Sequence, residues 1–85
     1  MSFIIEIKKS AEKDFLKLNN PIRDRIKKAI LNLKENPLPD GHKKLKNRED
    51  YRIRIGDYRV LYQIDNPART ITISRIRHRK EVYKQ

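Results

Sequence analysis

Residues 51–62 read YRIRIGDYRVLY, with apolar side chains at every second position on both sides of the Gly56-Asp57 pair. A period of two is typical of strands that bury one face. The Gly-Asp pair suits a two-residue hairpin turn, because glycine tolerates the left-handed backbone that such turns need. We therefore predict an antiparallel hairpin with one apolar face and one basic face, the latter carrying Arg52, Arg54 and Arg59.

A third strand follows the hairpin. Turn-forming residues 65–68 lead into an apolar and β-branched run from Arg69 to about Ile76. Regular alternation along this run would put Arg77 on the apolar face with Ile71 and Ile73. The same alternation would place four residues on the basic face: Thr72, Ser74, Ile76 and His78. Either a β-bulge near Arg75 shifts the alternation or the strand ends before Arg77, and the sequence leaves both alternatives open.

Two helices are expected before the hairpin, behind a short strand at residues 3–7. Ser10 is the expected N-cap of the first helix, and Asn20 with Pro21 breaks the pattern and starts the second. The second helix ends before Asn36-Pro37 and has an apolar stripe made of Ile22, Ile26, Ala29, Ile30 and Leu33.

The order of elements is therefore β-α-α-β-β-β, which predicts an α+β fold with two antiparallel helices packed on one face of a small, mainly antiparallel sheet. Residues 42–50 are rich in charge and are expected to form a basic surface loop. Tyr51, Tyr58 and Tyr62 lie in the apolar stripe and are expected in the core. We expect a single domain that spans residues 1–85.

Charge indicates the kind of partner. The chain has a formal net charge of +11, and residues 41–85 carry most of this excess. Such an excess favours a polyanion such as nucleic acid or an anionic membrane, and an acidic protein would satisfy the same field. The apolar run at residues 3–5 is too short for a signal segment or a membrane span, so we expect a cytoplasmic protein with no membrane partner.

Metal and cofactor chemistry finds little support in the composition. The chain has no cysteine, and its two histidines, His42 and His78, are too few for a zinc centre without help from carboxylates. We therefore expect no metal site and no cofactor.

Residues 75–83 read RIRHRKEVY and gather guanidinium groups, an imidazole and a phenol within a few positions. Arginine matches phosphate oxygens, and histidine titrates near neutral pH. Taken alone, such a run is better explained as a solvated basic tail. Together with the hairpin arginines it would form a cationic surface suited to single-stranded nucleic acid. The basic loop would add further RNA-binding side chains, namely Lys43, Lys44, Lys46 and Arg48.

Residues 56–62, GDYRVLY, and residues 77–83, RHRKEVY, resemble the RelE toxins of type II toxin–antitoxin systems, in the RelE/ParE superfamily. The likeness extends over nearly the whole chain. It implies the RelE/ParE toxin fold and a ribosome-dependent endoribonuclease, or mRNA interferase. Such an enzyme cleaves mRNA in the A site of the 70S ribosome and is silenced by an acidic, RelB-like antitoxin. Two alternatives remain: a ParE-like inhibitor of DNA gyrase and a non-catalytic nucleic-acid-binding module.

The resemblance also implies roles for individual residues. Arg59 and Arg77 would hold the phosphate, and Tyr83 would lie near the reacting nucleotide. Arg52 and Arg54 occupy second-strand positions that are often lysine in RelE-like sequences. Because a guanidinium group is a poor proton acceptor, the general base would be Tyr83 or His78. YoeB-like relatives place a glutamate in the basic loop, where this chain has Lys43 or Lys44, so dependence on the ribosome is expected to be strong.

Overall fold

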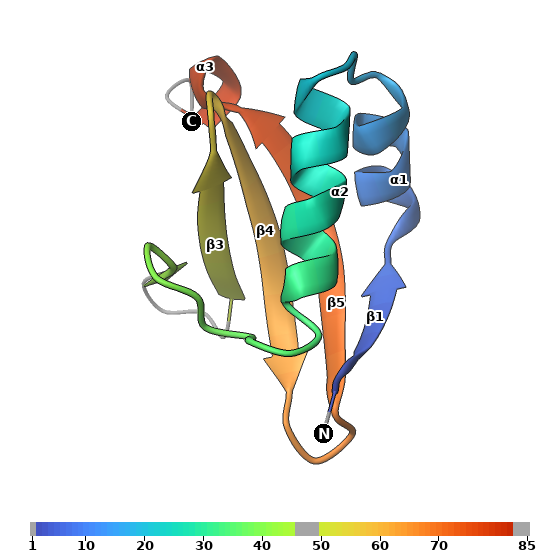
Figure 1. Cartoon of the computed structure of the whole chain (residues 1–85), viewed down its shortest axis with the longest axis vertical. Helices are drawn as coiled ribbons and strands as arrows, with labels where there is room; N and C mark the ends of the chain where they lie inside the picture. Colours follow the sequence, from blue (N-terminus) through green and yellow to red (C-terminus); the bar gives the residue numbers. More distant parts are fainter. Residues whose placement is uncertain (1, 46–49, 83–85) are drawn as a thin grey trace.

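The computed structural model describes residues 2–45 and 50–82, with the side chains of Glu81 and Val82 left aside. Its elements follow the chain as β1 (Ile4–Ile7), α1 (Lys9–Leu16), α2 (Ile22–Asn32), β2 (Lys43–Lys44), β3 (Asp50–Ile55), β4 (Tyr58–Asp65), β5 (Thr70–His78) and α3 (Arg79–Val82) (Figure 1). The predicted α+β order is confirmed, with β2 and α3 as additions.

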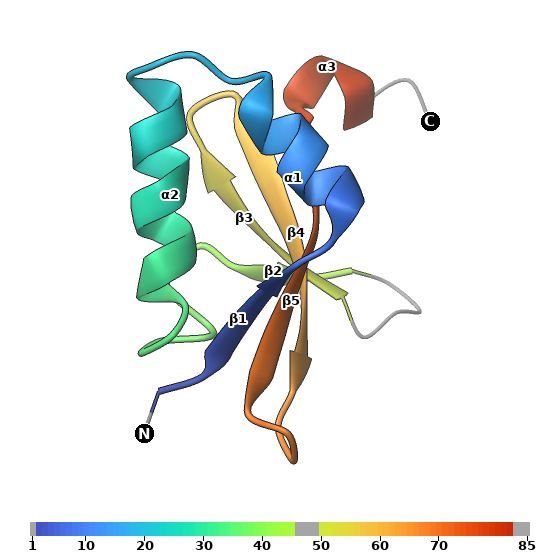
Figure 2. The ribbon, with the colours of Figure 1, turned by 90° about the vertical axis from the view of Figure 1, so that its right-hand side faces the viewer.

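Within the described residues the strands form one five-stranded sheet in the order β1-β5-β4-β3-β2. β1 runs parallel to β5, and the other neighbours are antiparallel. Helices α1 and α2 lie on the same side of this sheet (Figure 2). The expectation that the whole basic segment is loop is wrong for Lys43 and Lys44, because their backbone pairs with the edge of β3. The side chains of both lysines remain exposed.

The core lies between the helices and the sheet. The predicted stripe of α2 is confirmed: Ile26, Ile30 and Leu33 are buried, and Ile22 and Ala29 pack against them. The tyrosines also behave as predicted, since Tyr62 is fully buried and Tyr51 and Tyr58 pack against the same core. The sheet contributes further buried side chains, namely Ile53, Ile55, Val60, Ile71, Ile73 and Ile76.

Two predicted helix caps are wrong. Lys8 occupies the N-cap of α1 and makes no side-chain cap bond, while Ser10 lies inside the helix. The Ser10 hydroxyl instead donates to the carbonyl oxygen of Ser74 in β5, at 2.9 Å. At the second helix, Pro21 is the N-cap residue, so α2 begins one residue later than expected and Asn20 lies outside it.

A β-bulge in β5 resolves the conflict over Arg77. Tyr62 pairs with Ile73 and Leu61 pairs with Arg75, so Ser74 is an extra residue on the β5 side. After the bulge the alternation is shifted by one, which buries Ile76 opposite Val60 on the helix-covered face. The bulge alternative is therefore correct, and the placement of Ile76 and His78 on the basic face by regular alternation is wrong.

Candidate active site on the open sheet face

Arginines from three neighbouring strands lie in one line across the sheet. Arg54 of β3 pairs with Arg59 of β4, and Arg59 pairs with Arg77 of β5. Residues directly opposite each other in a ladder point to the same face. The adjacent residues Ile53, Val60 and Ile76 are buried beneath the helices. The set of Arg54, Arg59 and Arg77, called the arginine row below, therefore lies on the open face.

The arginine row places positive charges directly opposite each other on neighbouring strands. Like charges directly opposite each other destabilise a strand pair, and here two consecutive pairs are arginine with arginine. Arg59 and Arg77 are partly buried, whereas Arg54 is exposed. A bound phosphate would stabilise this arrangement, because guanidinium donors match phosphate oxygens in charge and geometry. The row is thus suited to an anionic ligand.

The remaining predicted RNA-binding residues divide between the two faces. Arg52 lies two residues from Arg54 on β3 and shares its face, opposite Leu61 and Lys43. Lys43 therefore extends the open face, whereas Lys44 pairs with Tyr51 and takes the helix-covered side. Lys46 and Arg48 lie outside the described residues. The register thus separates Lys43 from Lys44, which the sequence had grouped together.

His78 does not join the arginine row. It pairs with Tyr58 at the end of the ladder, and the two rings meet edge to face with centroids 5.1 Å apart. Its Nδ1 accepts the backbone N–H of Lys80 at 3.1 Å, at the start of α3. The bulge therefore turns His78 away from Arg77. The expectation that His78 lies on the open face is wrong, while its role in proton transfer stays a prediction.

Helix α3 is fastened to the turn of the hairpin. The backbone N–H of Arg79 donates to the Asp57 carbonyl oxygen at 2.7 Å. An exposed ion pair joins Arg79 Nη1 to Asp57 Oδ1 at 3.7 Å. The arginine row lies at this same end of the sheet, because Arg54 and Arg59 flank the turn by two residues. Tyr83 follows α3 in the sequence and lies outside the described residues.

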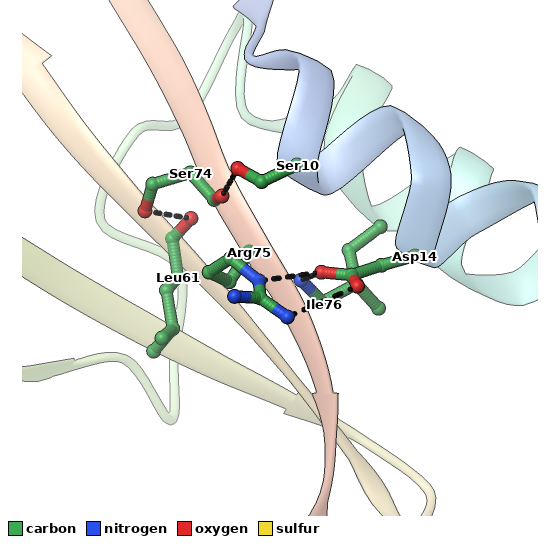
Figure 3. Close-up of polar contacts among 6 residues, drawn as sticks. All are labelled: Ser10, Asp14, Leu61, Ser74, Arg75 and Ile76. Carbon is green, nitrogen blue, oxygen red and sulfur yellow. Dashed lines mark hydrogen bonds and ion pairs between the residues drawn. The ribbon is translucent and has the colours of Figure 1, made fainter.

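Arg75 differs from the other arginines of the C-terminal run. Its Nε and Nη2 donate to the Asp14 carboxylate of α1, at 2.9 and 3.2 Å (Figure 3). Asp14 lies in the second turn of α1, on a different element from Arg75. The spacing of 61 residues between the two side chains carries no local signal, so this contact is visible in the tertiary structure alone.

Among residues 2–45 and 50–82, no three His, Asp or Glu side chains form a group that could hold a metal ion, and no helix is long and apolar enough to cross a membrane. A patch of exposed apolar side chains does occur along α1, α2 and β1. Its members are Ile4, Ile7, Leu16 and Leu31, and they line a groove together with Phe3 and Phe15.

Comparison with known proteins identifies the family. A family model described as the ParE toxin of the type II toxin–antitoxin system, parDE, matches residues 5–83. A RelE1 protein of Methanocaldococcus jannaschii is 38% identical over 88 positions, which cover 99% of this chain and 98% of the relative. The mRNA interferase toxin RelE of Escherichia coli is 25% identical over 89 positions, covering 100% of this chain and 94% of that protein.

Solved structures agree with this result. In the archaeal RelE–RelB complex of Pyrococcus horikoshii, one chain superimposes with a TM-score of 0.83 at 27% identity, covering 93% of this chain and 97% of that one. The resemblance noted in the sequence is confirmed. The chain belongs to the ParE toxin family, within the RelE/ParE superfamily, and is a toxin of a type II toxin–antitoxin system.

Proposed function

We propose that this toxin is a ribosome-dependent endoribonuclease, an mRNA interferase that cuts mRNA in the A site of the 70S ribosome in the cytoplasm. The observation that carries the proposal is the arginine row, which runs across three strands in register on the open face. The similarity to the mRNA interferase toxin RelE of Escherichia coli supports it. RNA outside a duplex is bound by backbone charge contacts and stacking, and an open cationic sheet suits this mode.

The proposed reaction is attack of a ribose 2′-oxygen on the adjacent phosphorus. A P–O2′ bond forms and the P–O5′ bond breaks, which leaves a 2′,3′-cyclic phosphate and a 5′-hydroxyl. The 2′-hydroxyl proton passes to a general base, and a proton is delivered to the leaving 5′-oxygen. Arg59 and Arg77 stabilise the negative charge that develops on the phosphorane. In this scheme the reaction needs neither a metal ion nor a cofactor.

Proton transfer falls to Tyr83 first and to His78 second. Arginine side chains stay protonated, so the arginine row cannot supply the base. His78 Nδ1 is already used by the Lys80 N–H, and the ring rests against Tyr58 on the other face. These contacts favour Tyr83 instead, which comes directly after α3 in the sequence. His78 would have to leave its ring contact before it could reach a nucleotide on the open face.

RNA binding would extend from the arginine row along β3 and β2. Arg52 and Lys43 share the face of the arginine row and would contact the backbone of neighbouring nucleotides. Lys44, Lys46 and Arg48 belong to the same basic segment and would contact the RNA or the ribosome.

The cognate antitoxin would be a small acidic, RelB-like protein. Such a partner would cover the open face and neutralise its charge. The same partner would also shield the exposed apolar patch of Ile4, Ile7, Leu16 and Leu31. Without a partner this patch would face water, and exposed apolar patches are typical of protein interaction sites. The similar structure from Pyrococcus horikoshii is a complex of RelE with RelB, which supports an antitoxin of this kind.

Gyrase inhibition is the second candidate, because the matching family model is described as a ParE toxin. This activity would need no reaction at the arginine row. It predicts that DNA supercoiling by gyrase is blocked and that mRNA on ribosomes stays intact.

Primer extension on mRNA from programmed ribosomes tests the proposal. The wild-type toxin should cut within the A-site codon, and Arg77→Ala and Tyr83→Phe should each lower the single-turnover cleavage rate by about 10²-fold. Lys28→Ala is the matched control, because Lys28 is an exposed cation on α2, far from the open face. Antitoxin binding should persist in all variants. Wild-type rates in both site variants, or blocked supercoiling without any cut, would overturn the proposal.

A further inference from the structure

The edge of β5 is held in two different ways along its length. β1 pairs with residues Thr70 to Ile73, and the last backbone bond from this side is Lys8 N–H to the Ile73 carbonyl oxygen, at 3.0 Å. The chain then turns into α1. Beyond Ile73, the edge of β5 therefore faces α1, and a helical backbone does not present the extended row of N–H and C=O groups that would continue the ladder.

Side chains of α1 take over where β1 stops (Figure 3). Ser10 Oγ donates to the Ser74 carbonyl oxygen at 2.9 Å, and the Ile76 N–H donates to Asp14 Oδ2 at 2.9 Å. On the other side of the bulge, Ser74 Oγ donates to the Leu61 carbonyl oxygen at 3.1 Å. The bulge and the end of β1 both leave backbone groups of this region without ladder partners, and such groups need other partners when they are enclosed. Here three hydroxyl or carboxylate contacts supply them.

Asp14 contributes more than one bond. Its carboxylate accepts from the Ile76 N–H and also from Nε and Nη2 of Arg75, so three donors converge on two oxygens. The Asp14 side chain is 14% exposed, compared with 42% for Arg75. Charge-assisted bonds to a shielded carboxylate are stronger and more directional than neutral ones. The carboxylate thus holds both residues that immediately precede Arg77.

The position of the bulge decides which face Arg77 occupies. A one-residue slip in a strand moves every following side chain to the other face. If the residues after Ser74 slipped, Arg77 would turn into the core and Ile76 would face water. We propose that Ser10 and Asp14 are positioning residues, which hold the bulge at Ser74 and thereby keep Arg77 in the arginine row. Both residues would act through β5 rather than through contact with the RNA, and the effect on cleavage rests on the proposed function.

Amide hydrogen exchange tests the positioning directly and needs no activity. In Asp14→Ala, the amide of Ile76 should exchange about tenfold faster or more, and that of Arg77 should follow, while amides of α2 keep their protection. Asp14→Asn keeps an oxygen that can accept from Ile76 and should lie between Asp14→Ala and the wild type. Glu12→Ala is the matched control, since Glu12 is an exposed carboxylate on the same helix. Unchanged exchange at Ile76 in Asp14→Ala would overturn the inference.

A double-mutant cycle, in which kcat for mRNA cleavage is measured, tests whether Asp14 acts through Arg77. Asp14→Ala should lower kcat by about tenfold in the wild-type background, with KM changed little. In the Arg77→Ala background the same substitution should change kcat by less than about twofold, because the side chain that it positions is absent. Independent effects that multiply would show that Asp14 acts elsewhere and would contradict the inference.

Two further outcomes are decisive. If the wild-type toxin cuts no mRNA, the proposed function fails, while hydrogen exchange still decides the positioning. If Asp14→Ala does not fold, Ser10→Ala replaces it, because that variant removes one bond to the Ser74 carbonyl and leaves the ion pair. Ser10→Ala should speed amide exchange at residues 75–77 and lower the cleavage rate, as is expected of Asp14→Ala. Wild-type behaviour of Ser10→Ala would then count against the inference.

Discussion

The two faces of the sheet are made from alternate residues of the same strands, yet they have opposite properties. Ile53, Val60 and Ile76 form a buried row under the helices. One residue along each strand, the arginine row faces outward with three adjacent cations. The covered face stabilises the fold through apolar burial. On the open face like charges stand directly opposite each other, an arrangement that disfavours strand pairing, and we infer that binding of an anion relieves this repulsion.

β5 contributes side chains to both faces, although its apolar residues do not alternate regularly along the strand. Before the bulge, Ile71 and Ile73 point to the core. After the bulge, Ile76 points to the core. Ile76 is three residues after Ile73, and regular alternation would put it on the other face. It reaches the core because Ser74 is an extra residue in the strand. The arginine row is therefore complete in β5 because one residue is left out of the ladder. Substitutions on the two faces should therefore separate stability from function.

Truncating the covered face should have the largest effect on stability. Ile73→Ala removes a fully buried side chain of β5 and should lower the free energy of unfolding by about 2–5 kcal/mol. Urea unfolding followed by circular dichroism measures this change. Ile4→Ala is the matched control, because Ile4 lies in β1 and is 62% exposed. A loss within about 0.5 kcal/mol in Ile73→Ala would contradict the assignment of this face to the core.

Truncating the open face should affect function and leave stability nearly unchanged. Arg59→Ala should lower cleavage about 10²-fold, which corresponds to about 2.7 kcal/mol of transition-state stabilisation. Its free energy of unfolding should stay within about 1 kcal/mol of the wild type, because the side chain lies on the open face, outside the apolar core. Single-turnover cleavage and urea unfolding measure the two quantities. A variant that unfolds easily and still cleaves normally would break the division between the faces.

Tyr62 probes the covered face by pH. Its hydroxyl donates to the Pro37 carbonyl oxygen at 2.7 Å, so Tyr62→Phe should cost about 1 kcal/mol at neutral pH. Burial, with a smaller contribution from Tyr51, raises the pKa of Tyr62 to about 12. An unfolded tyrosine titrates near pH ~10, so the folded state holds the proton more tightly. The stability that this provides is complete below about pH 10 and is lost as the pH rises towards 12.

The sign of this effect gives a measurable slope. Between pH 10 and 12 the free energy of unfolding of the wild type should fall about 1.4 kcal/mol per pH unit more steeply than that of Tyr62→Phe. Urea unfolding of both proteins from pH 8 to 11.5 measures the difference. Equal slopes would show that the Tyr62 phenol is not shielded by the core.

The smallest expected effect separates two neighbouring lysines. Lys43 shares the open face with Arg52, whereas Lys44 pairs with Tyr51 on the covered side. Lys43→Ala should weaken binding of single-stranded RNA about twofold to fourfold and reduce the salt dependence of log K by about 0.7, as loss of one phosphate contact implies. Lys44→Ala should change both quantities less. Fluorescence anisotropy over a salt series measures both quantities. Equal effects of Lys43→Ala and Lys44→Ala would contradict the assignment of the two lysines to opposite faces of β2.

Much of the fold follows from local patterns. The hairpin, the stripe of α2 and the open face with Arg52, Arg54 and Arg59 were all predicted correctly, because a period of two or of 3.6 is written in neighbouring residues. The caps at Ser10 and Asn20 were wrong. A serine before a helical pattern has the local features of a cap, and its hydroxyl is used instead by Ser74, 64 residues away.

The candidate site divides in the same way. The sequence alone determined that an arginine-rich face exists, that Arg59 belongs to it, and that a bulge or a strand end must intervene near Arg75. The tertiary structure decided that Ser74 is the bulged residue, that Arg77 joins the arginine row and that His78 turns away. The reason is physical: strand alternation is local, whereas the partners that make this bulge favourable, Ser10 and Asp14, come from a helix more than 60 residues earlier in the chain.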